Sequence, residues 1–183
     1  YAYDFESNMI HPMWTDGTDL TNYEIKRYGY YGKKGDIIKA KPAGSLLLYS
    51  YVQAYNITEE EILWNMIRGI SRGRGLGEPG VNPGSGVNLN LETDCADPVM
   101  LLAFLKMYKK FNHNQYLRLV QEIGENIITD RYQNGLFLTA NDENKVKFNT
   151  IDPLALLHLA AVQEDISKDI PDYNTGGQGY FSP

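Results

Sequence analysis

Apolar residues in the middle of the chain recur with helical spacing. Residues 45–56 carry them at i, i+1, i+4, i+5 and i+8, and a second stripe follows within residues 58–71. This spacing places apolar side chains on one face of a helix. The two stripes are formed by Leu47, Leu48, Tyr51, Val52 and Tyr55, and by Ile62, Leu63, Met66, Ile67 and Ile70. We therefore predict a helical hairpin over residues 45–72, with Thr58 as the N-cap of the second helix and Glu61 completing a capping box.

The same pattern returns about 53 residues later. Asp97 and Pro98 provide an N-cap and a first helical residue for a helix ending at Phe111, and residues 115–132 carry the next stripe. A shift by 53 places Tyr55, Leu63, Met66, Ile67 and Ile70 on Tyr108, Tyr116, Leu119, Val120 and Ile123. Residues 152–163 open a third unit with the same Asp-Pro start. Repetition at a fixed period predicts stacked helical hairpins.

The connections alternate between tight turns and long segments. Residues 73–96 and 131–151 are long, and the second contains two strand-like runs, 135–140 and 145–150, on either side of a turn at 141–144. Long loops in a helical domain are usually functional or disordered. We predict an all-α fold, a partial (α/α) toroid of helical hairpins with long loops and a small β-hairpin. Five helices do not close such a ring, so residues 1–183 are expected to form a single segment of a larger enzyme.

Composition excludes several classes of protein. With 17 Lys and Arg against 23 Asp and Glu, the chain has a net charge of −6, which argues against a general nucleic-acid binder. The sequence contains no run of about 18 apolar residues, so no membrane span is predicted. Cys95, the single cysteine, is expected to be a small buried apolar group, and no Cys/His spacing typical of a metal site is present. The start of the chain lacks the features of a signal peptide, so we expect a processed or truncated chain and leave localisation open.

Residues 1–43 form an aromatic and basic region that we expect to contact substrate. Rings there can stack on sugars, and cations can bind carboxylates, Arg as a rigid fork and Lys as a mobile charge. The residues are Trp14, Arg27, Tyr28, Tyr30, Tyr31, Lys33 and Lys34. In an acidic chain they make a local positive island, which predicts an acidic polysaccharide as ligand. The alternative is a solvated loop whose tyrosines anchor it to helix ends.

Five further residues are candidates for a site. Arg72 and Arg74 are flanked by glycines and can reach a cleft, although cations at a helix C-terminus also favour its dipole. Glu92 and Asp94 have the residue types of a glycosidase acid and base, although such acids also bind backbone N–H groups. His11 is a candidate acid or base because it belongs to the aromatic region. We expect His158 in the core or at its rim and His113 in a solvent-exposed turn.

Several stretches together resemble a known family. "HPMWTDGTDLTNYEIKRYGYYGKKG", "RGRGLGEPG", "DPLALLHLAAVQ" and "GGQGYF" occur in the order and style of the C-terminal half of pectate lyases of polysaccharide lyase family 2. The resemblance implies cleavage of polygalacturonate by β-elimination, with an Arg base and a His/Glu cluster that holds a divalent metal in the N-terminal half. This chain has no matching His-Arg-Glu constellation and no evident cofactor. We therefore expect it to bind substrate, with the missing half or a second chain supplying the rest.

The resemblance also implies roles for the candidate residues. Trp14, Tyr30 and Tyr31 would stack on sugar rings, while the Arg and Lys candidates would bind the carboxylates of polygalacturonate or an oligogalacturonide. Two alternatives stay open. In the first, the chain is a fragment of a glycoside hydrolase or sugar epimerase toroid, with Glu92 or Asp94 as the acid. In the second, it is a non-catalytic helical-repeat domain whose Tyr-rich loops bind protein.

Overall fold

The computed structural model of the chain describes residues 2–29, 32–139, 142–146, 150–166 and 170. Over these residues it contains five helices, which are α1 (Ser45–Thr58), α2 (Glu61–Gly73), α3 (Pro98–Phe111), α4 (Asn114–Arg131) and α5 (Asp152–Gln163). Small antiparallel sheets are formed by β1 (Tyr3–Asp4), β2 (Met9–Ile10), β3 (Lys41–Pro42), β4 (Gly77–Glu78), β5 (Asn88–Leu89), β6 (Tyr132–Gln133), β7 (Leu136–Thr139) and β8 (Asp142–Val146). The mostly helical fold is confirmed.

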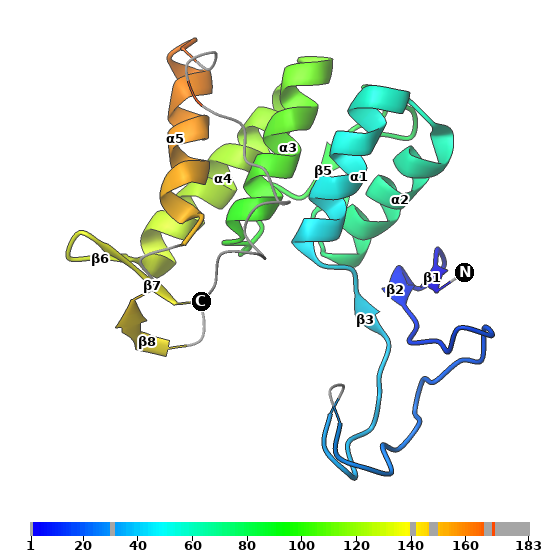
Figure 1. Cartoon of the computed structure of the whole chain (residues 1–183). Coiled ribbons are helices and arrows are strands. Elements are labelled where there is room, and N and C mark those ends of the chain that lie inside the picture. The colour runs from blue at the N-terminus through cyan, green and yellow to red at the C-terminus, as the bar shows by residue number, and fades with distance from the viewer. Residues whose placement is uncertain (1, 30–31, 140–141, 147–149, 167–169, 171–183) are drawn as a thin grey trace.

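The helices pack in two layers (Figure 1). Helices α1, α3 and α5 stand side by side with α3 in the middle, and α2 and α4 pack behind them. Helix α3 is buried along most of its length, from Pro98 to Leu105 and at Met107. A helix that is apolar all round is stable only when neighbours cover each of its faces. The paired helices follow from the sequence repeat, while the toroid stays a prediction.

The tight turns and the long connections lie at opposite ends of the helices. Lys110, near the end of α3, forms an ion pair with Glu59 in the turn between α1 and α2, with 2.7 Å between Nζ and Oε1. The N-terminal region enters α1 at the other end, where the β6–β8 sheet also lies (Figure 1). We call these the turn end and the loop end.

The helix starts show which capping predictions hold. Asp97 caps α3 as predicted, since its Oδ1 accepts hydrogen bonds from the backbone N–H groups of Val99 at 2.8 Å and Met100 at 3.2 Å. The predicted cap of α2 is wrong. Thr58 is the last residue of α1, where its hydroxyl donates to the Ala54 carbonyl, and Glu60 is the N-cap of α2. A Thr hydroxyl bonded to the carbonyl four residues earlier is compatible with continued helix, so α1 extends through it.

Helix α5 does not use the predicted Asp-Pro cap. Ile151 takes the N-cap position, and Asp152 lies in the first helical turn. The Asp152 side chain is only 1% exposed and forms an ion pair with Arg131 at the end of α4, with 2.6 Å between Oδ1 and Nη1. The carboxylate therefore joins α4 to α5 instead of binding the N–H groups of its own helix.

The predicted core face of α2 is wrong at one position. Ile62 was predicted on the core face of α2, but its side chain is 57% exposed, whereas Trp64 is buried. Trp64 also donates a hydrogen bond from Nε1 to the Gly80 carbonyl at 3.1 Å. Its ring packs against Tyr55 and Phe111 at the turn end. A large ring with one polar atom suits this position, because the connection after α2 supplies the hydrogen-bond acceptor.

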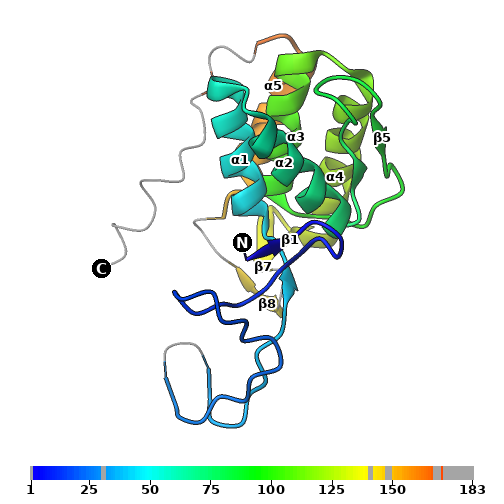
Figure 2. The same cartoon turned by 90° about the vertical axis from the view of Figure 1, so that its right-hand side faces the viewer.

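The long connection 74–97 links α2 to α3 and covers α2 and α4 from the outside, with β5 at the outer edge beside α4 (Figure 2). In the first half of the connection, Gly77 and Gly80 contact α2, and Gly84 lies against the ring of Phe111 near the turn end. In the second half, the Leu89 N–H donates to Gln115 Oε1 of α4 at 3.1 Å, and Asn126 Nδ2 of α4 donates to the Thr93 carbonyl. The two ends of the segment, where β4 pairs with β5, lie side by side. The segment packs against α2 through β4 and against α4 through β5, while residues 81–83 and 85–86 are exposed.

The predicted β-hairpin exists with a different register. Strands β7 and β8 pair antiparallel, with Leu138 opposite Val146 and Thr139 opposite Asp142. The predicted turn at 141–144 is wrong, because β8 begins at Asp142. Strand β6, which follows α4 directly, adds a third strand.

Candidate functional site

The N-terminal region forms an arm that projects from the loop end of the helices (Figures 1 and 2). Its root is the β1–β2–β3 sheet, in which Tyr3 pairs with Ile10 and Met9 with Pro42. Beyond the root, two antiparallel segments meet through bridges between Glu24 and Ile37 and between Gly29 and Gly32. The described residues of the aromatic and basic stretch are therefore joined by backbone pairing, although the sequence shows no regular spacing there.

Two short turns shape the near half of the arm. The Thr18 N–H donates to Asp16 Oδ1 at 2.9 Å, and the Thr21 N–H donates to Asp19 Oδ1 at 2.7 Å. Hydrogen bonds from the backbone and side chain of Thr18 lower the pKa of Asp16, and those from Thr21 do the same for Asp19. His11 joins the second turn through Thr21 Oγ1, 3.0 Å from its Nδ1. These acids therefore stay charged and hold the loop in shape.

The arm keeps large aromatic rings in contact with solvent. The side chains of Trp14 and Tyr28 are 57% and 78% exposed, and Tyr23 is also exposed. Tyr30 and Tyr31 lie outside the described residues. Exposed rings that are grouped on one element are typical of a binding surface.

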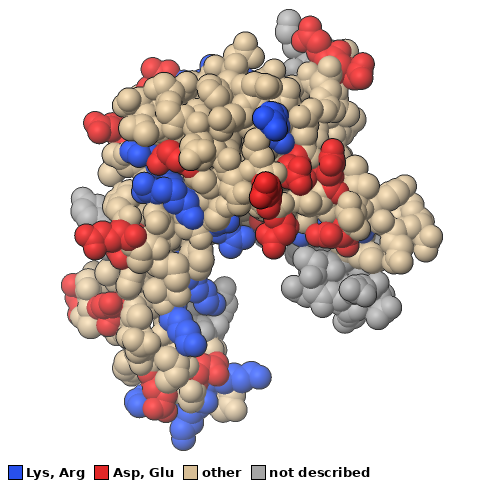
Figure 3. All heavy atoms as spheres, turned by 180° about the vertical axis from the view of Figure 1, so that it is seen from behind, with Lys and Arg blue, Asp and Glu red and all other residues tan. Residues whose placement is uncertain are grey.

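The same element carries free cations. Arg27, Lys33 and Lys34 are exposed, and no carboxylate in the described part of the chain pairs with them. Lys26 differs, since its Nζ lies 3.3 Å from Glu24 Oε2. On the face shown in Figure 3, basic side chains lie at the far end of the arm and near its junction with the helical body, with acidic side chains among them. The structure thus brings together Trp14, Arg27, Tyr28 and the two lysines on one element.

The root of the arm rests on the last turns of α2. The Tyr3 hydroxyl lies directly over Gly69, where an added Cβ would overlap with it, and the Asn8 carbonyl lies over Gly73. Beside this contact is an apolar groove of about 520 Å³, lined by residues that include Phe5, Leu47, Tyr51, Ile62 and Met66. The glycines let the root approach the helix backbone closely.

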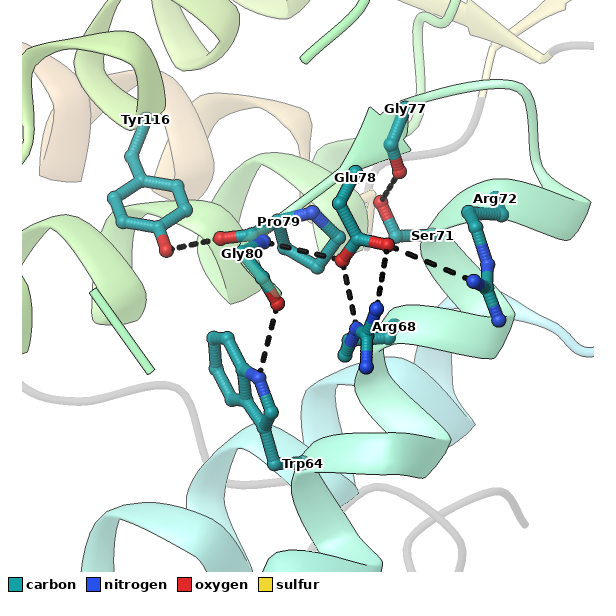
Figure 4. A network of polar contacts seen from close by, with 9 residues as sticks. All are labelled: Trp64, Arg68, Ser71, Arg72, Gly77, Glu78, Pro79, Gly80 and Tyr116. Atoms are coloured by element: carbon teal, nitrogen blue, oxygen red, sulfur yellow. Dashed lines mark hydrogen bonds and ion pairs between the residues drawn. The ribbon is translucent and has the colours of Figure 1, made fainter. Parts of the chain in front are cut away.

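Arg72 belongs to a polar cluster around Glu78 at this contact (Figure 4). Glu78 accepts two hydrogen bonds from Arg68, 2.9 Å from Nε and 3.1 Å from Nη2, and Arg72 Nη1 lies 3.6 Å away. Burial raises the pKa of Glu78, but hydrogen bonds from Arg68 and the Gly80 N–H, with the charges of both arginines, outweigh it and lower the pKa overall. Glu78 is therefore ionised at neutral pH.

The backbone on both sides of Glu78 is fixed by side chains from two helices (Figure 4). The Ser71 hydroxyl donates to the Gly77 carbonyl at 2.8 Å, and the Tyr116 hydroxyl donates to the Pro79 carbonyl at 2.5 Å. Burial raises the pKa of Tyr116 far above its ordinary value, so its hydroxyl keeps the proton that it donates. Glu78 is not among the predicted site residues, although the sequence places this acid shortly after three arginines in "RGISRGRGLGEPG".

The comparisons with known proteins decide the family. The family model described as periplasmic pectate lyase matches residues 1–182. This chain belongs to that family. A curated relative, the pectate disaccharide-lyase of Dickeya dadantii (strain 3937), is 28% identical over 181 residues, or 99% of this chain. The chain spans 31% of the length of that relative. The resemblance seen in the sequence is confirmed, and the assignment to the C-terminal half stays a prediction.

Among the remaining candidates of this pectate lyase family member, Arg74 and Asp94 lie on the two joined ends of the connection between α2 and α3, and the charges of both act on Cys95. Arg74 is exposed just after α2, and Glu92 and Asp94 are exposed on the returning connection before α3. His11 is bonded within the arm. Cys95 is half-buried against the core, and burial raises the pKa of its thiol. His158 is buried, as expected, whereas His113 caps α4 by accepting from the Gln115 N–H.

The family resemblance implies a divalent metal in the complete enzyme. Among the residues that the structure describes, no three His, Cys, Asp or Glu side chains form a group that can hold a metal ion. These residues therefore do not fit that metal, and no metal role is assigned to them. Within the same residues, no helix has the length and apolar character needed to cross a membrane.

Proposed function

We propose that this chain is a polygalacturonate-binding part of a pectate lyase, and that the arm is its main binding element. The proposal rests chiefly on the arm, which in a member of this family displays exposed rings and unpaired cations away from the helical core. Tyr30 and Tyr31 are included in the proposal from their sequence alone.

The chemistry of the polymer fits this combination of side chains. Each uronate unit has an apolar C–H face and a carboxylate. Trp14 and Tyr28 offer flat faces for stacking, while Arg27, Lys33 and Lys34 offer positive charge. The molecule as a whole has a net charge of −6, but residues 26–34 of the arm carry four cations and no carboxylate, so this stretch is where a polyanion is attracted. Such binding should weaken as salt screens the exposed charges.

The proposed contribution to cleavage is electrostatic. In β-elimination a base takes the proton α to the carboxylate, a double bond forms, and the glycosidic oxygen leaves. Negative charge builds up next to the carboxylate in the transition state. Cations held against that carboxylate stabilise this charge. The candidates for this role are Arg27, Lys33, Lys34, Arg72 and Arg74. The base itself is not assigned within this chain.

A double substitution in the arm tests the proposal. Lys33→Ala with Lys34→Ala should weaken binding of polygalacturonate by about 5- to 30-fold at low salt, because two exposed charge contacts are each worth about 0.5–1 kcal/mol. Titration calorimetry in low and high salt measures this effect, and circular dichroism should show unchanged helix content. Arg118→Ala is the control, since Arg118 is an exposed cation on α4, away from the arm.

The outcomes separate the proposal from its alternatives. Unaltered affinity in the double variant contradicts the role of the arm. Salt-insensitive binding of neutral glycans would favour a hydrolase or epimerase. Absence of any glycan binding would favour an interaction domain.

A further inference from the structure

We propose that Glu78 is a positioning residue that presents Arg72 as a carboxylate-binding group for the polymer at the root of the arm. This inference rests on the proposed function, because it needs a uronate polymer bound to the arm.

The charges around Glu78 do not balance. Arg68 already occupies both carboxylate oxygens in a two-pronged geometry, at 2.9 and 3.1 Å. Arg72 adds a second positive charge through one longer contact of 3.6 Å, and its side chain is 39% exposed. The pair Arg68–Glu78 is neutral without it. Arg72 is therefore a surplus cation whose other N–H groups can bind a second carboxylate.

Glu78 is held in place from several directions. The flanking carbonyls of Gly77, Pro79 and Gly80 accept hydrogen bonds from Ser71, Tyr116 and Trp64. The Gly80 N–H also donates to Glu78 Oε1 at 3.2 Å. A carboxylate fixed in this way limits the positions of a flexible Arg side chain. Less conformational entropy is then lost when that Arg binds a ligand.

Arg72 lies beside the root of the arm. It stands three residues after Gly69 on α2, so both positions belong to one face of the helix. Gly69 is covered by the hydroxyl of Tyr3 and Gly73 by the backbone of Asn8. Arg72 is also close enough to Tyr3 to affect its pKa. Burial raises the pKa of Tyr3, and the positive charge of Arg72 partly offsets this increase. A polymer held along the arm toward the helices would meet Arg72 at this junction.

The cluster also has a purely structural explanation. A cation in the last turn of α2 stabilises the helix dipole by about 0.3–1 kcal/mol, and the ion pair fixes the connection. That explanation requires no effect of Arg72 on ligand affinity. A binding measurement therefore separates the two accounts.

The test is a double-mutant cycle on the 183-residue chain with an oligogalacturonate as the probe. Arg72→Ala keeps the Arg68–Glu78 pair and should weaken binding by about 5- to 10-fold, with a smaller dependence on salt. Arg72→Lys should recover part of the loss. Glu78→Gln should weaken binding by about 3-fold in the natural background and should have no effect in Arg72→Ala, because it acts through Arg72.

Three results would overturn the inference. They are unchanged affinity in Arg72→Ala, additive effects of the two substitutions, and tighter binding in Glu78→Gln, which would make Glu78 merely a repelling charge. Lys33→Ala with Lys34→Ala is measured in parallel. If that double variant weakens binding and Arg72→Ala does not, only the inference fails. If the natural chain does not bind the probe at all, the proposed function fails.

Discussion

Glu78 gives the clearest prediction at the scale of single residues. Its folded-state pKa lies below the ordinary value of 4.5, although burial alone would raise it. The ionised side chain therefore stabilises the fold at neutral pH, and this stabilisation is lost as pH falls through the folded-state pKa. In urea unfolding between about pH 7 and pH 3, Glu78→Gln should be less stable by about 1–2 kcal/mol at neutral pH, with the difference shrinking on acidification. A difference that stays constant with pH contradicts this role.

Residue roles could be predicted from sequence when the partner is local. Asp97 was recognised as a cap because it binds N–H groups two and three residues later. Thr58 was misassigned because the same hydroxyl can also bond back to its own helix. Glu78 and Tyr116 were missed, since Tyr116 binds a carbonyl 37 residues away in a loop without periodicity. Only folding brings such partners together.

At the scale of elements, the docking of the arm on α2 depends on Gly69. Gly69→Ala adds a Cβ that would overlap with the Tyr3 hydroxyl and lie 2.9 Å from Cε1 of the same ring. We expect the root to move away, so that the amides of Met9 and Ile10 exchange faster with solvent while those of α3 and α4 do not change. The matched control is the same substitution in a Tyr3→Ala background, where the added methyl group meets no ring and should slightly favour the helix. Unchanged exchange in the single variant contradicts this docking.

The elements were predicted well where apolar spacing is regular. The helix pairs and the hairpin follow from spacing alone. The path of the connection 74–97 could not be predicted, because the segment has no regular apolar spacing. In the structure its backbone carbonyls accept hydrogen bonds from Trp64, Ser71 and Tyr116, so it packs against α2 and α4. A sequence shows which side chains are polar but not which carbonyls will satisfy them.

At the scale of the whole molecule, the function depends on a division between two parts. The helical body supplies stability through its continuous apolar core. The arm has little core of its own and projects from the loop end with its rings and cations exposed. Because the exposed charged groups on the arm lie outside that core, substitutions of these groups should change binding more than stability.

Mapping the bound ligand by NMR tests this division most directly. Amide and side-chain shifts of the 183-residue chain are followed as an oligogalacturonate is added. We predict changes at Trp14, Tyr28, Lys33 and Arg72, and none at the turn end around Glu59. Binding that shifts the turn end and leaves the arm unchanged would contradict the account.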